Sequence, residues 1–218
     1  MEKAKEDVFQ TAPDIAYRII SQKILDGEFQ PGMKLSRRKM AEVTNVSVIP
    51  VIEALKRLEE DGLVESKPQW GSFVAVPTRK RIIQCYQLRE AIECQCARIL
   101  SQTITAEQLE ELYGIARELD TVPYAEERAA DSRDHHLRFH NCLAEYTDND
   151  LLVRTLNRMN LFWVLCKALS ARASSIETPR YWHCKLVDEI ASGDPERAEK
   201  AMREHVLDSL EPVLNTLE

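Results

Sequence analysis

The sequence predicts a mainly α-helical protein of two domains: a small N-terminal domain that ends in a β-hairpin, and a larger domain built only of helices. Apolar residues recur at helical spacing along most of the 218 residues, two β-rich runs lie just before Pro77, and no strand pattern follows that proline. A chain of this length can bury the cores of one or two domains. We expect the domains to cover residues 8–77 and 78–218.

Three helices and a hairpin are expected in the first domain. Gly27 ends the first helix and Asn45 the second, while Ser36 and Ser47 are the expected N-caps of the second and third. Pro50 lies in the first turn of the third helix, where its missing N–H costs little. The expected helices cover residues 12–26, 36–43 and 47–62, and the hairpin turns at 68–71. This order of elements is that of a winged helix-turn-helix.

The second domain is expected to be an all-α bundle of about six amphipathic helices. Thr78 begins the first, and Thr105 with Gln108 forms a capping box for the second. Asp194 and Pro195 are the expected N-cap and first residue of the last helix. The expected helices cover residues 78–101, 105 onward, 126–147, 150–172, 177–192 and 195–217.

Charge and composition narrow the class of protein. The formal net charge is −7, and residues 1–77 carry 11 basic and 12 acidic side chains, so a nucleic-acid site would have to be a local patch in this part. No apolar run is long enough to span a membrane, and the opening residues MEKAKEDVFQ contain no apolar stretch of a secretory signal. The six cysteines show no CxxC spacing. We therefore expect a cytoplasmic protein with reduced thiols and no membrane partner.

The segment from Gly27 to Val74 resembles the N-terminal domain of GntR-family transcriptional regulators. It contains the opening G…PG…L, the recognition helix VS…PV…EAL.RL…DGLV and the wing G.FV. The resemblance implies binding to double-stranded operator DNA. Arg38, Ser47 and Gly71 match an arginine, a hydroxyl and the wing glycine of the family. The expected DNA-binding residues are Lys34, Arg37, Arg38, Lys39, Ser47, Val48, Ile49, Ile52 and Gly71.

This N-terminal domain, called the head below, carries residues suited to DNA binding, but it differs from the family at two positions. Four basic residues without an intervening acid can neutralise phosphates, namely Lys34, Arg37, Arg38 and Lys39. Val48 and Ile52 stand where the family usually carries arginines, so hydrogen-bonded base readout is lost there. They lie on the helix face opposite Val51, Leu55 and Leu58. Three explanations stay open: a T-rich operator, weak binding strengthened by dimer avidity, or an apolar tip that binds a protein instead.

Residues 78–218 resemble the FCD-type effector domain found in one large branch of this family. The resemblance rests on LREAIE, RFHNCLAEYTDNDLL and HCKLVDEIASGDPERAEKAMREHV. Many such domains hold a divalent metal through an Asp-x3-His pair on one helix and two later histidines. His140, His183 and His205 match these histidines, and His136 occupies the aspartate position. The resemblance thus implies a metal site of four imidazoles, with His135 as a bystander.

The spacing of the histidines agrees with such a site. His136 and His140 are four apart and share a helix face. His183 lies ten residues before the Gly-Asp-Pro break and His205 ten after it, so on two antiparallel helices they reach the same height. An imidazole site suits zinc first, with nickel, cobalt or copper as alternatives. Without a carboxylate ligand the ion keeps its full +2 charge, which favours an anionic metabolite as the effector.

Other residues near the expected site allow two interpretations each. Arg89 matches the arginine that opens the R…E helix of FCD domains and is expected to bind an effector carboxylate; the alternative is a helix-surface pair with Glu93. Cys142 and Cys184 are expected to be buried thiols on other helix faces. Four aromatic side chains either line the effector cavity or belong to the core: Tyr86, Phe139, Phe162 and Trp163.

These features predict a metabolite-responsive transcriptional regulator, expected to be a repressor and a homodimer, since a twofold protein gains from two half-sites. The small carboxylate effector would act by preferring one arrangement of the dimer. We expect no enzyme activity, because Glu145, five residues past His140, lies on another helix face and supplies no general base. The alternatives are a metal-dependent hydrolase and a protein-interaction module that has lost operator binding.

Overall fold

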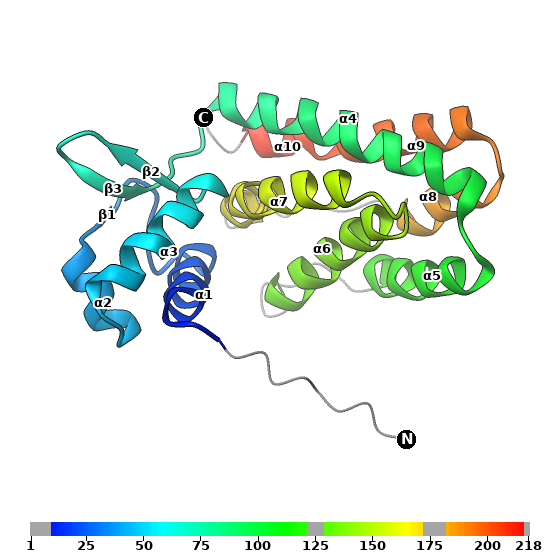
Figure 1. Cartoon of the computed structure of the whole chain (residues 1–218). Helices are drawn as coiled ribbons and strands as arrows, with labels where there is room; N and C mark the ends of the chain where they lie inside the picture. The colour runs from blue at the N-terminus through cyan, green and yellow to red at the C-terminus, as the bar shows by residue number, and fades with distance from the viewer. Residues whose placement is uncertain (1–9, 122–128, 172–181, 216–218) are drawn as a thin grey trace, which may run out of the picture. The chain divides into compact units, whose positions relative to one another are not determined.

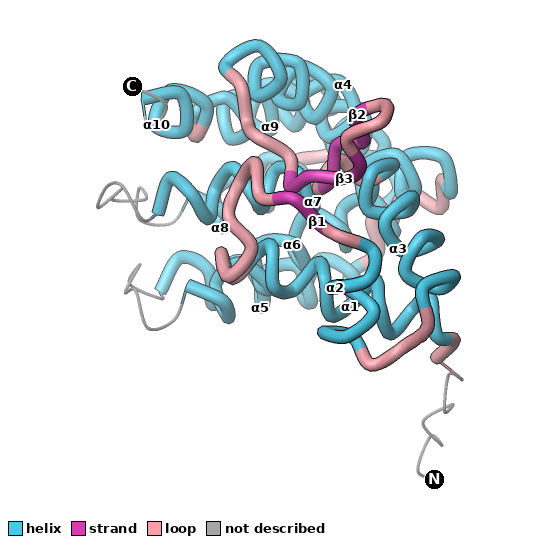
Figure 2. The backbone as a smooth tube through the Cα atoms, turned by 90° about the vertical axis from the view of Figure 1, so that its left-hand side faces the viewer, coloured by secondary structure: helices cyan, strands magenta, loops and turns pink. Residues whose placement is uncertain are grey.

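The computed structural model describes residues 10–121, 129–171 and 182–215, with side chains except at 129–134, 163 and 167–171 (Figure 1). The chain divides into two compact units, Met1–Val76 and Pro77–Glu218. Strands occur only in the first unit of the described chain, and the rest is helix and loop (Figure 2). The fold class predicted from the sequence, a mainly α protein with a winged helix-turn-helix head and a helical bundle, is confirmed.

The first unit consists of three helices and a small sheet. Its elements are α1 (Ala12–Leu25), β1 (Lys34–Leu35), α2 (Arg37–Thr44), α3 (Val48–Glu60), β2 (Val64–Lys67) and β3 (Gly71–Val74). Thr11 and Asp14 form a capping box that starts α1. Ile20 of α1 and Leu58 of α3 are fully buried, because the apolar faces of these two helices pack on each other.

The turn between α2 and α3 follows from its local sequence. Asn45 has a left-handed backbone (φ 54°) and ends α2, as the sequence predicts. Ser47 then takes an extended backbone and becomes the N-cap residue of α3. The turn therefore holds two short helices at the spacing of a helix-turn-helix.

The sheet contains one strand that the sequence analysis did not predict. The order is β1-β3-β2, and β3 pairs antiparallel with both neighbours. Only two residues form β1, so no period-2 pattern could indicate it. Gln69 and Gly71 have positive φ (64° and 97°), which the tight turn between β2 and β3 requires. The hairpin is thus a wing anchored to the segment that leads into α2.

The second unit is a helical bundle. Its elements are α4 (Arg79–Thr103), α5 (Ala106–Thr121), α6 (Ala129–Glu145), α7 (Asp150–Ala171), α8 (Trp182–Ala191), α9 (Pro195–Asp208) and α10 (Leu210–Asn215). The long α4 packs along α9, α5 packs against α8, and α6 contacts both α5 and α7. None of the described helices is both long and apolar enough to cross a membrane.

One helix expected in the bundle is divided in the structure, and two expected helix starts fall outside the described residues. The single helix expected over 195–217 is wrong, because the chain breaks at Ser209 between α9 and α10. Pro212 explains the break, since its ring would clash with the carbonyl four residues earlier if α9 continued. The expected helix starts at 126 and 177 lie outside the described residues.

Candidate functional site

Four histidines from three helices converge inside the second unit. His136 and His140 come from α6, His183 from the first turn of α8, and His205 from the last turn of α9. The ring centroids of His136 lie 4.7 Å from His140, 5.2 Å from His183 and 6.1 Å from His205. The His205 centroid lies 5.3 Å from His140 and 4.9 Å from His183. The residues expected to form one cluster therefore do lie together.

The ring nitrogens show which of these histidines are closest to sharing an ion. One ligand nitrogen each of His136, His140 and His205 lies within 4.8 Å of the others. The Nε2 atoms of His136 and His140 are 3.0 Å apart. His183 does not belong to this tighter set of three, but its Nε2 is buried without a hydrogen-bond partner among the described residues. A buried imidazole nitrogen without a partner is costly and indicates a ligand position.

The fold brings the last two histidines together by the means that the sequence predicts. Gly193 has φ 78° and Asp194 caps the start of α9 through the backbone N–H groups of its first residues. The resulting tight turn makes α8 and α9 neighbours, and the rings of His183 and His205 meet at the same height. The predicted pairing of these two residues across the turn is confirmed.

Two carboxylates, Glu93 and Asp120, hold the outer sides of the histidine rings. Oε2 of Glu93 on α4 faces Nδ1 of His140, and both side chains are almost fully buried. Nδ1 of His183 lies 2.8 Å from Oδ1 of Asp120 on α5. Asp120 also accepts from the backbone N–H groups of His183 and Cys184, so it caps the start of α8. Carboxylates that bind the far nitrogen of a histidine are typical partners of metal ligands.

The electrostatics of these pairs favour an ionised Glu93 beside a neutral imidazole. Burial by itself raises the pKa of Glu93, but the charge of Arg89 and the hydrogen bonds from Arg89 and His140 outweigh it and lower the pKa to about 2. Burial lowers the pKa of His140. For Asp120, burial again opposes ionisation, but the hydrogen bonds from His183 and Cys184 dominate and lower the pKa. Neutral imidazoles beside ionised carboxylates are the state that binds a cation.

The roles of Glu93 and Asp120 were missed by the sequence analysis. Glu93 was considered only as a surface partner of Arg89. Asp120 and His183 are 63 residues apart, and no pattern in the chain connects them. The signal for Glu93 was its place in the segment LREAIE, which is half apolar and therefore a candidate for burial.

Arg89 is buried and paired with Glu93. Its Nε lies 2.6 Å from Oε1 of Glu93, and both side chains are 2% exposed. Of the two roles expected for Arg89, the geometry favours the pair with Glu93. The expectation that this pair lies on the helix surface is wrong, because α9, α7, α6 and α8 all pack on α4.

The aromatic and thiol neighbours of the cluster belong to the core. Phe139 is fully buried, with its edge against His140 and His183 at centroid distances of 5.6 and 5.2 Å. The Tyr86 hydroxyl donates to the Ser209 carbonyl (3.1 Å). Phe162 is buried beneath Arg81, and the Trp163 side chain lies outside the described residues. Cys142 is buried as expected, but the expectation of a buried thiol is wrong for Cys184, which is only half-buried.

His135 is separate from the cluster. Its Nδ1 lies 3.5 Å from Oε2 of Glu118, and both side chains are about half exposed. Glu145 is exposed and does not join the histidines either. The cluster therefore gains no general base from the residue that a hydrolase interpretation would use.

The first unit presents the basic and apolar residues expected to bind DNA at its surface. Lys34, Arg37, Arg38, Lys39, Ser47 and Gly71 are exposed or partly exposed. The side chain of Arg38 is 92% exposed, with Glu42 Oε1 3.9 Å from its Nε. Val48, Ile49 and Ile52 are 41%, 78% and 41% exposed. The expectation that Val48 and Ile52 face away from the buried stripe of α3 is confirmed.

A hollow lies between the start of α2 and the wing. It has a volume of about 660 Å³, and its basic and aromatic lining residues are Lys34, Arg37, Arg38, Lys67 and Trp70. Trp70 is 70% exposed at the turn of the hairpin. Lys67 and Trp70 were not predicted as site residues. Their place in the hairpin beside the basic cluster was the available signal.

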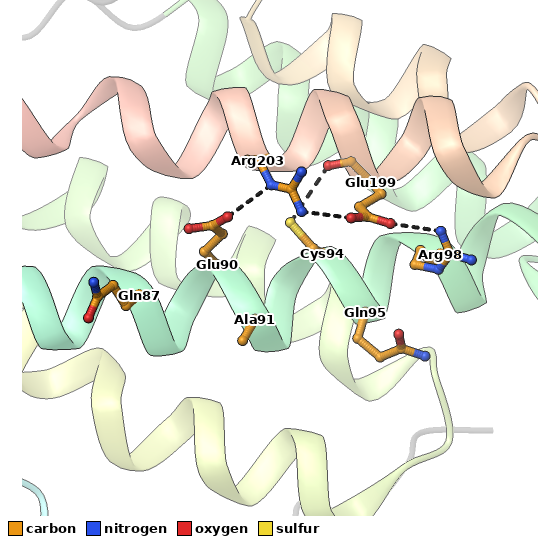
Figure 3. Close-up of a pocket in the computed structure, with 8 residues that line it drawn as sticks. All are labelled: Gln87, Glu90, Ala91, Cys94, Gln95, Arg98, Glu199 and Arg203. Atoms are coloured by element: carbon orange, nitrogen blue, oxygen red, sulfur yellow. Dashed lines mark hydrogen bonds and ion pairs between the residues drawn. The ribbon is translucent and has the colours of Figure 1, made fainter.

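A second hollow, of about 460 Å³, lies on the face formed by α4 and α9 (Figure 3). Its charged residues form a continuous chain: Glu90 binds Arg203, Arg203 binds Glu199, and Glu199 binds Arg98. The N···O distances in this chain are 2.9, 2.7 and 2.7 Å. The ion pairs connect α4 with α9 and neutralise one another's charges. The hollow therefore offers no unpaired charge of this chain of residues to a charged ligand.

Comparison with known proteins agrees with both units. Residues 14–74 match the bacterial regulatory proteins of the gntR family, and residues 84–208 match the FCD domain. The HTH-type transcriptional repressor RspR of Escherichia coli is 28% identical over 200 residues, which cover 90% of this chain and 86% of RspR. A protein named "Probable D-xylose utilization operon transcriptional repressor" of Paenarthrobacter nicotinovorans is 26% identical over 190 residues, covering 86% of this chain and 82% of that one.

The fold recurs in a solved structure. A GntR transcriptional regulator of Rhodococcus sp. RHA1 superposes with a TM-score of 0.74 at 24% identity, covering 93% of this chain and 97% of that chain. The family matches show more than the fold, because the FCD match alone covers over half of the chain. The chain therefore belongs to the GntR family of DNA-binding transcriptional regulators, in the branch that carries an FCD effector domain.

Proposed function

We propose that this regulator is a homodimeric repressor whose operator binding changes when a small anionic metabolite binds at a histidine-held divalent metal. The observation that carries the proposal is the convergence of His136, His140, His183 and His205 inside the second unit. Four histidines from three helices meet there, although the chain has only five in all. A structural role alone would not explain a buried His183 Nε2 without a partner among the described residues.

The donor set fits a transition metal. Imidazole nitrogens suit zinc, nickel, cobalt or copper better than magnesium or calcium, which prefer oxygen. When bound, the ion would supply open coordination positions for an anionic ligand. Glu93 and Asp120 lie one imidazole further out, where they orient His140 and His183. Arg89 offsets the charge of Glu93, so the net negative charge near the cluster is smaller than two carboxylates would suggest.

The effector is proposed to be a small carboxylate that reaches the cation. Phe139 closes one side of the cluster, while His136 is only partly buried, so the approach is from the side of His136. Arg89 remains a candidate for the effector carboxylate, but its pair with Glu93 favours an anchoring role instead. The names of the relatives include one repressor of a sugar-utilisation operon, which supports a metabolic effector.

Operator binding is proposed to begin with phosphate contacts from Lys34, Arg37, Arg38 and Lys39 around the start of α2. Val48, Ile49 and Ile52 would then meet thymine methyl groups in the major groove, which apolar side chains can contact. Ser47 and Gly71 would contact the backbone beside them. A palindromic operator read by two heads gives the avidity that a weakly reading helix needs.

The response to the effector is proposed to be thermodynamic linkage. An effector that binds one arrangement of the FCD domains more tightly shifts the dimer towards that arrangement and changes the fit of the two heads to the operator. Operator DNA must then change effector affinity by the same factor. This reciprocity separates a regulator from a protein that binds metal for stability alone.

A gel-shift titration against the promoter region of its own gene tests this function. The wild type should shift the DNA, and a panel of small carboxylic acids should change the midpoint only while a metal chelator is absent. His183→Ala should keep basal DNA affinity and lose the response, whereas His135→Ala should behave as wild type. A response that survives both chelator and His183→Ala would contradict the proposed site.

The exposed apolar tip of α3 favours a second candidate, a head that binds a protein. Ile49 is 78% exposed and Val48 and Ile52 are each 41% exposed, so the tip of α3 presents three large apolar side chains that a protein partner could cover. Absence of any shifted band at low salt, together with retained metal binding, would favour this candidate. No described residue favours a hydrolase, since the carboxylates at the cluster are engaged with imidazoles.

A further inference from the structure

Three buried side chains, Arg89, Glu93 and His140, lie in a line that ends at the histidine cluster. Nε of Arg89 lies 2.6 Å from Oε1 of Glu93. Oε2 of Glu93 faces Nδ1 of His140. Nε2 of His140 lies 3.0 Å from Nε2 of His136. All three members of the line are at most 2% exposed, so water does not compete for these contacts.

The donors and acceptors along this line are fixed by chemistry. A guanidinium can only donate hydrogen bonds, and an ionised carboxylate can only accept them. Glu93 accepts from Arg89 at one oxygen, and its other oxygen, which faces Nδ1 of His140, can only be satisfied there if that nitrogen carries the proton. A neutral imidazole carries one proton, so a proton on Nδ1 leaves Nε2 with a lone pair.

We propose that Arg89 and Glu93 are positioning residues that fix the tautomer of His140, so that its Nε2 always presents a lone pair to the centre of the cluster. The consequence for metal binding rests on the proposed function; the tautomer itself does not. Since two lone pairs at 3.0 Å repel, His136 donates its own Nε2 proton to His140 while no cation is present. Arg89 and Glu93 thus orient the Nε2 lone pair of His140 before a metal binds. His136 is then the residue whose Nε2 proton must move when a cation arrives.

His183 is prepared in the same way by different means. Asp120 accepts from Nδ1 of His183 and, in place of an arginine, from two backbone N–H groups at the start of α8. The Nε2 of His183 is left buried without a partner among the described residues, as a lone pair aimed at a cation would be. Two independent carboxylates therefore select the same tautomer on two different helices.

The substitution Glu93→Gln tests this assignment because Arg89 dictates how the new amide must lie. The amide oxygen has to face the donor Nε of Arg89, so the amide NH₂ faces Nδ1 of His140. His140 must then accept at Nδ1 and carry its proton on Nε2. Nitrogen-15 NMR of histidine-labelled, metal-free protein distinguishes a pyridine-type from a pyrrole-type Nε2. We expect the former for His140 in the wild type and the latter in Glu93→Gln.

Glu118→Gln is the matched control, since it makes the same change beside the exposed His135. It should leave the nitrogen signals of His140 unchanged. A double variant, Arg89→Met with Glu93→Gln, removes the donor that dictates the amide orientation. Its amide is free to turn its oxygen to His140, so the wild-type tautomer should return. This double variant also keeps the test usable if Glu93→Gln alone folds poorly, because no buried charge is left unpaired.

Zinc affinity, measured by competition with a chromogenic chelator, is the second readout. Glu93→Gln should weaken zinc binding by about 10–100-fold, the usual effect of losing an outer partner of a metal-bound histidine. Glu118→Gln should bind zinc as the wild type does. The proposal is overturned if His140 in metal-free wild type carries its proton on Nε2, or if Glu93→Gln leaves its tautomer unchanged.

The two proposals can fail separately. If the wild type binds no zinc, cobalt, nickel or copper, the proposed function fails while the NMR result still decides the tautomer. If the wild type binds zinc and Glu93→Gln binds it equally well, the positioning role fails while the metal site stands.

Discussion

The two units carry their functional residues in opposite ways. In the first unit the expected DNA-binding residues are exposed or partly exposed and lie within a stretch of 38 positions, from Lys34 to Gly71. In the second unit the histidines lie on three helices, and their supporting carboxylates come from two more. Exposed positions of the first surface, such as Val48 and Ile52, can be substituted at little cost to folding, because they lie outside the core. The second is part of the core, so each change there alters stability as well as chemistry.

The contrast predicts its largest effect at Glu93. Glu93→Ala leaves the buried Arg89 without its partner and should cost about 3–5 kcal/mol of unfolding free energy. Glu118→Ala removes a half-exposed carboxylate beside His135 and should cost about 0–1 kcal/mol. Urea denaturation of both variants measures the difference. Equal losses would mean that the line of buried contacts contributes no more than a surface pair.

The next largest effect is expected at His183. His183→Ala should lower zinc affinity by more than about 100-fold, because a lost ligand costs more than a lost outer partner. DNA affinity without effector should stay at the wild-type value, since the head does not contain this residue. Zinc competition measures the expected loss of zinc affinity, and a gel shift on the same preparation measures the expected retention of DNA affinity. A parallel loss of DNA binding and of cooperative unfolding would make the cluster structural instead.

A smaller effect is expected from restoring the arginines of the head. Val48→Arg with Ile52→Arg should tighten binding to a family-like, G-containing operator by about 1–3 kcal/mol per contact made. Leu88→Arg with Leu151→Arg adds the same two charges at exposed apolar positions of the second unit and serves as the control. No gain in the double variant beyond this control would show that α3 does not enter the groove.

The smallest expected effect concerns the basic cluster. Arg37→Ala with Arg38→Ala should lower the slope of log affinity against log salt by about 2, and should do so for every DNA sequence alike. Arg154→Ala, an exposed arginine of the second unit, should leave the slope unchanged. A double variant with the wild-type slope would remove these residues from the DNA surface.

Much of the fold was predictable because its signals are local. Asn45 and Ser47 mark helix ends through their backbone conformations, while Asp194 does so with a capping side chain and Pro195 with its ring, and all of these act within a few residues. The two-residue strand β1 was not predictable, since it exists only through pairing with β3. The break at Ser209 was available from Pro212, although helical periodicity across it masks the signal.

The candidate site was predictable only in part, for a similar reason. The i, i+4 pair and the symmetry of His183 and His205 about a turn are sequence signals, and both led to rings that meet. The contact between Asp120 and His183 spans 63 residues and depends on α5 packing against α8. The burial of Arg89 likewise depends on which helices cover α4. Long-range packing decides these partners, and no local pattern encodes it.

Anomalous diffraction at the metal edge of crystals grown with zinc tests the central claim most directly. We predict one peak per chain at about 2.0–2.1 Å from ring nitrogens of His136, His140, His183 and His205. The peak should vanish in His183→Ala and persist in His135→Ala. Absence of a peak at the cluster in crystals that show zinc elsewhere on the wild-type protein would contradict the account.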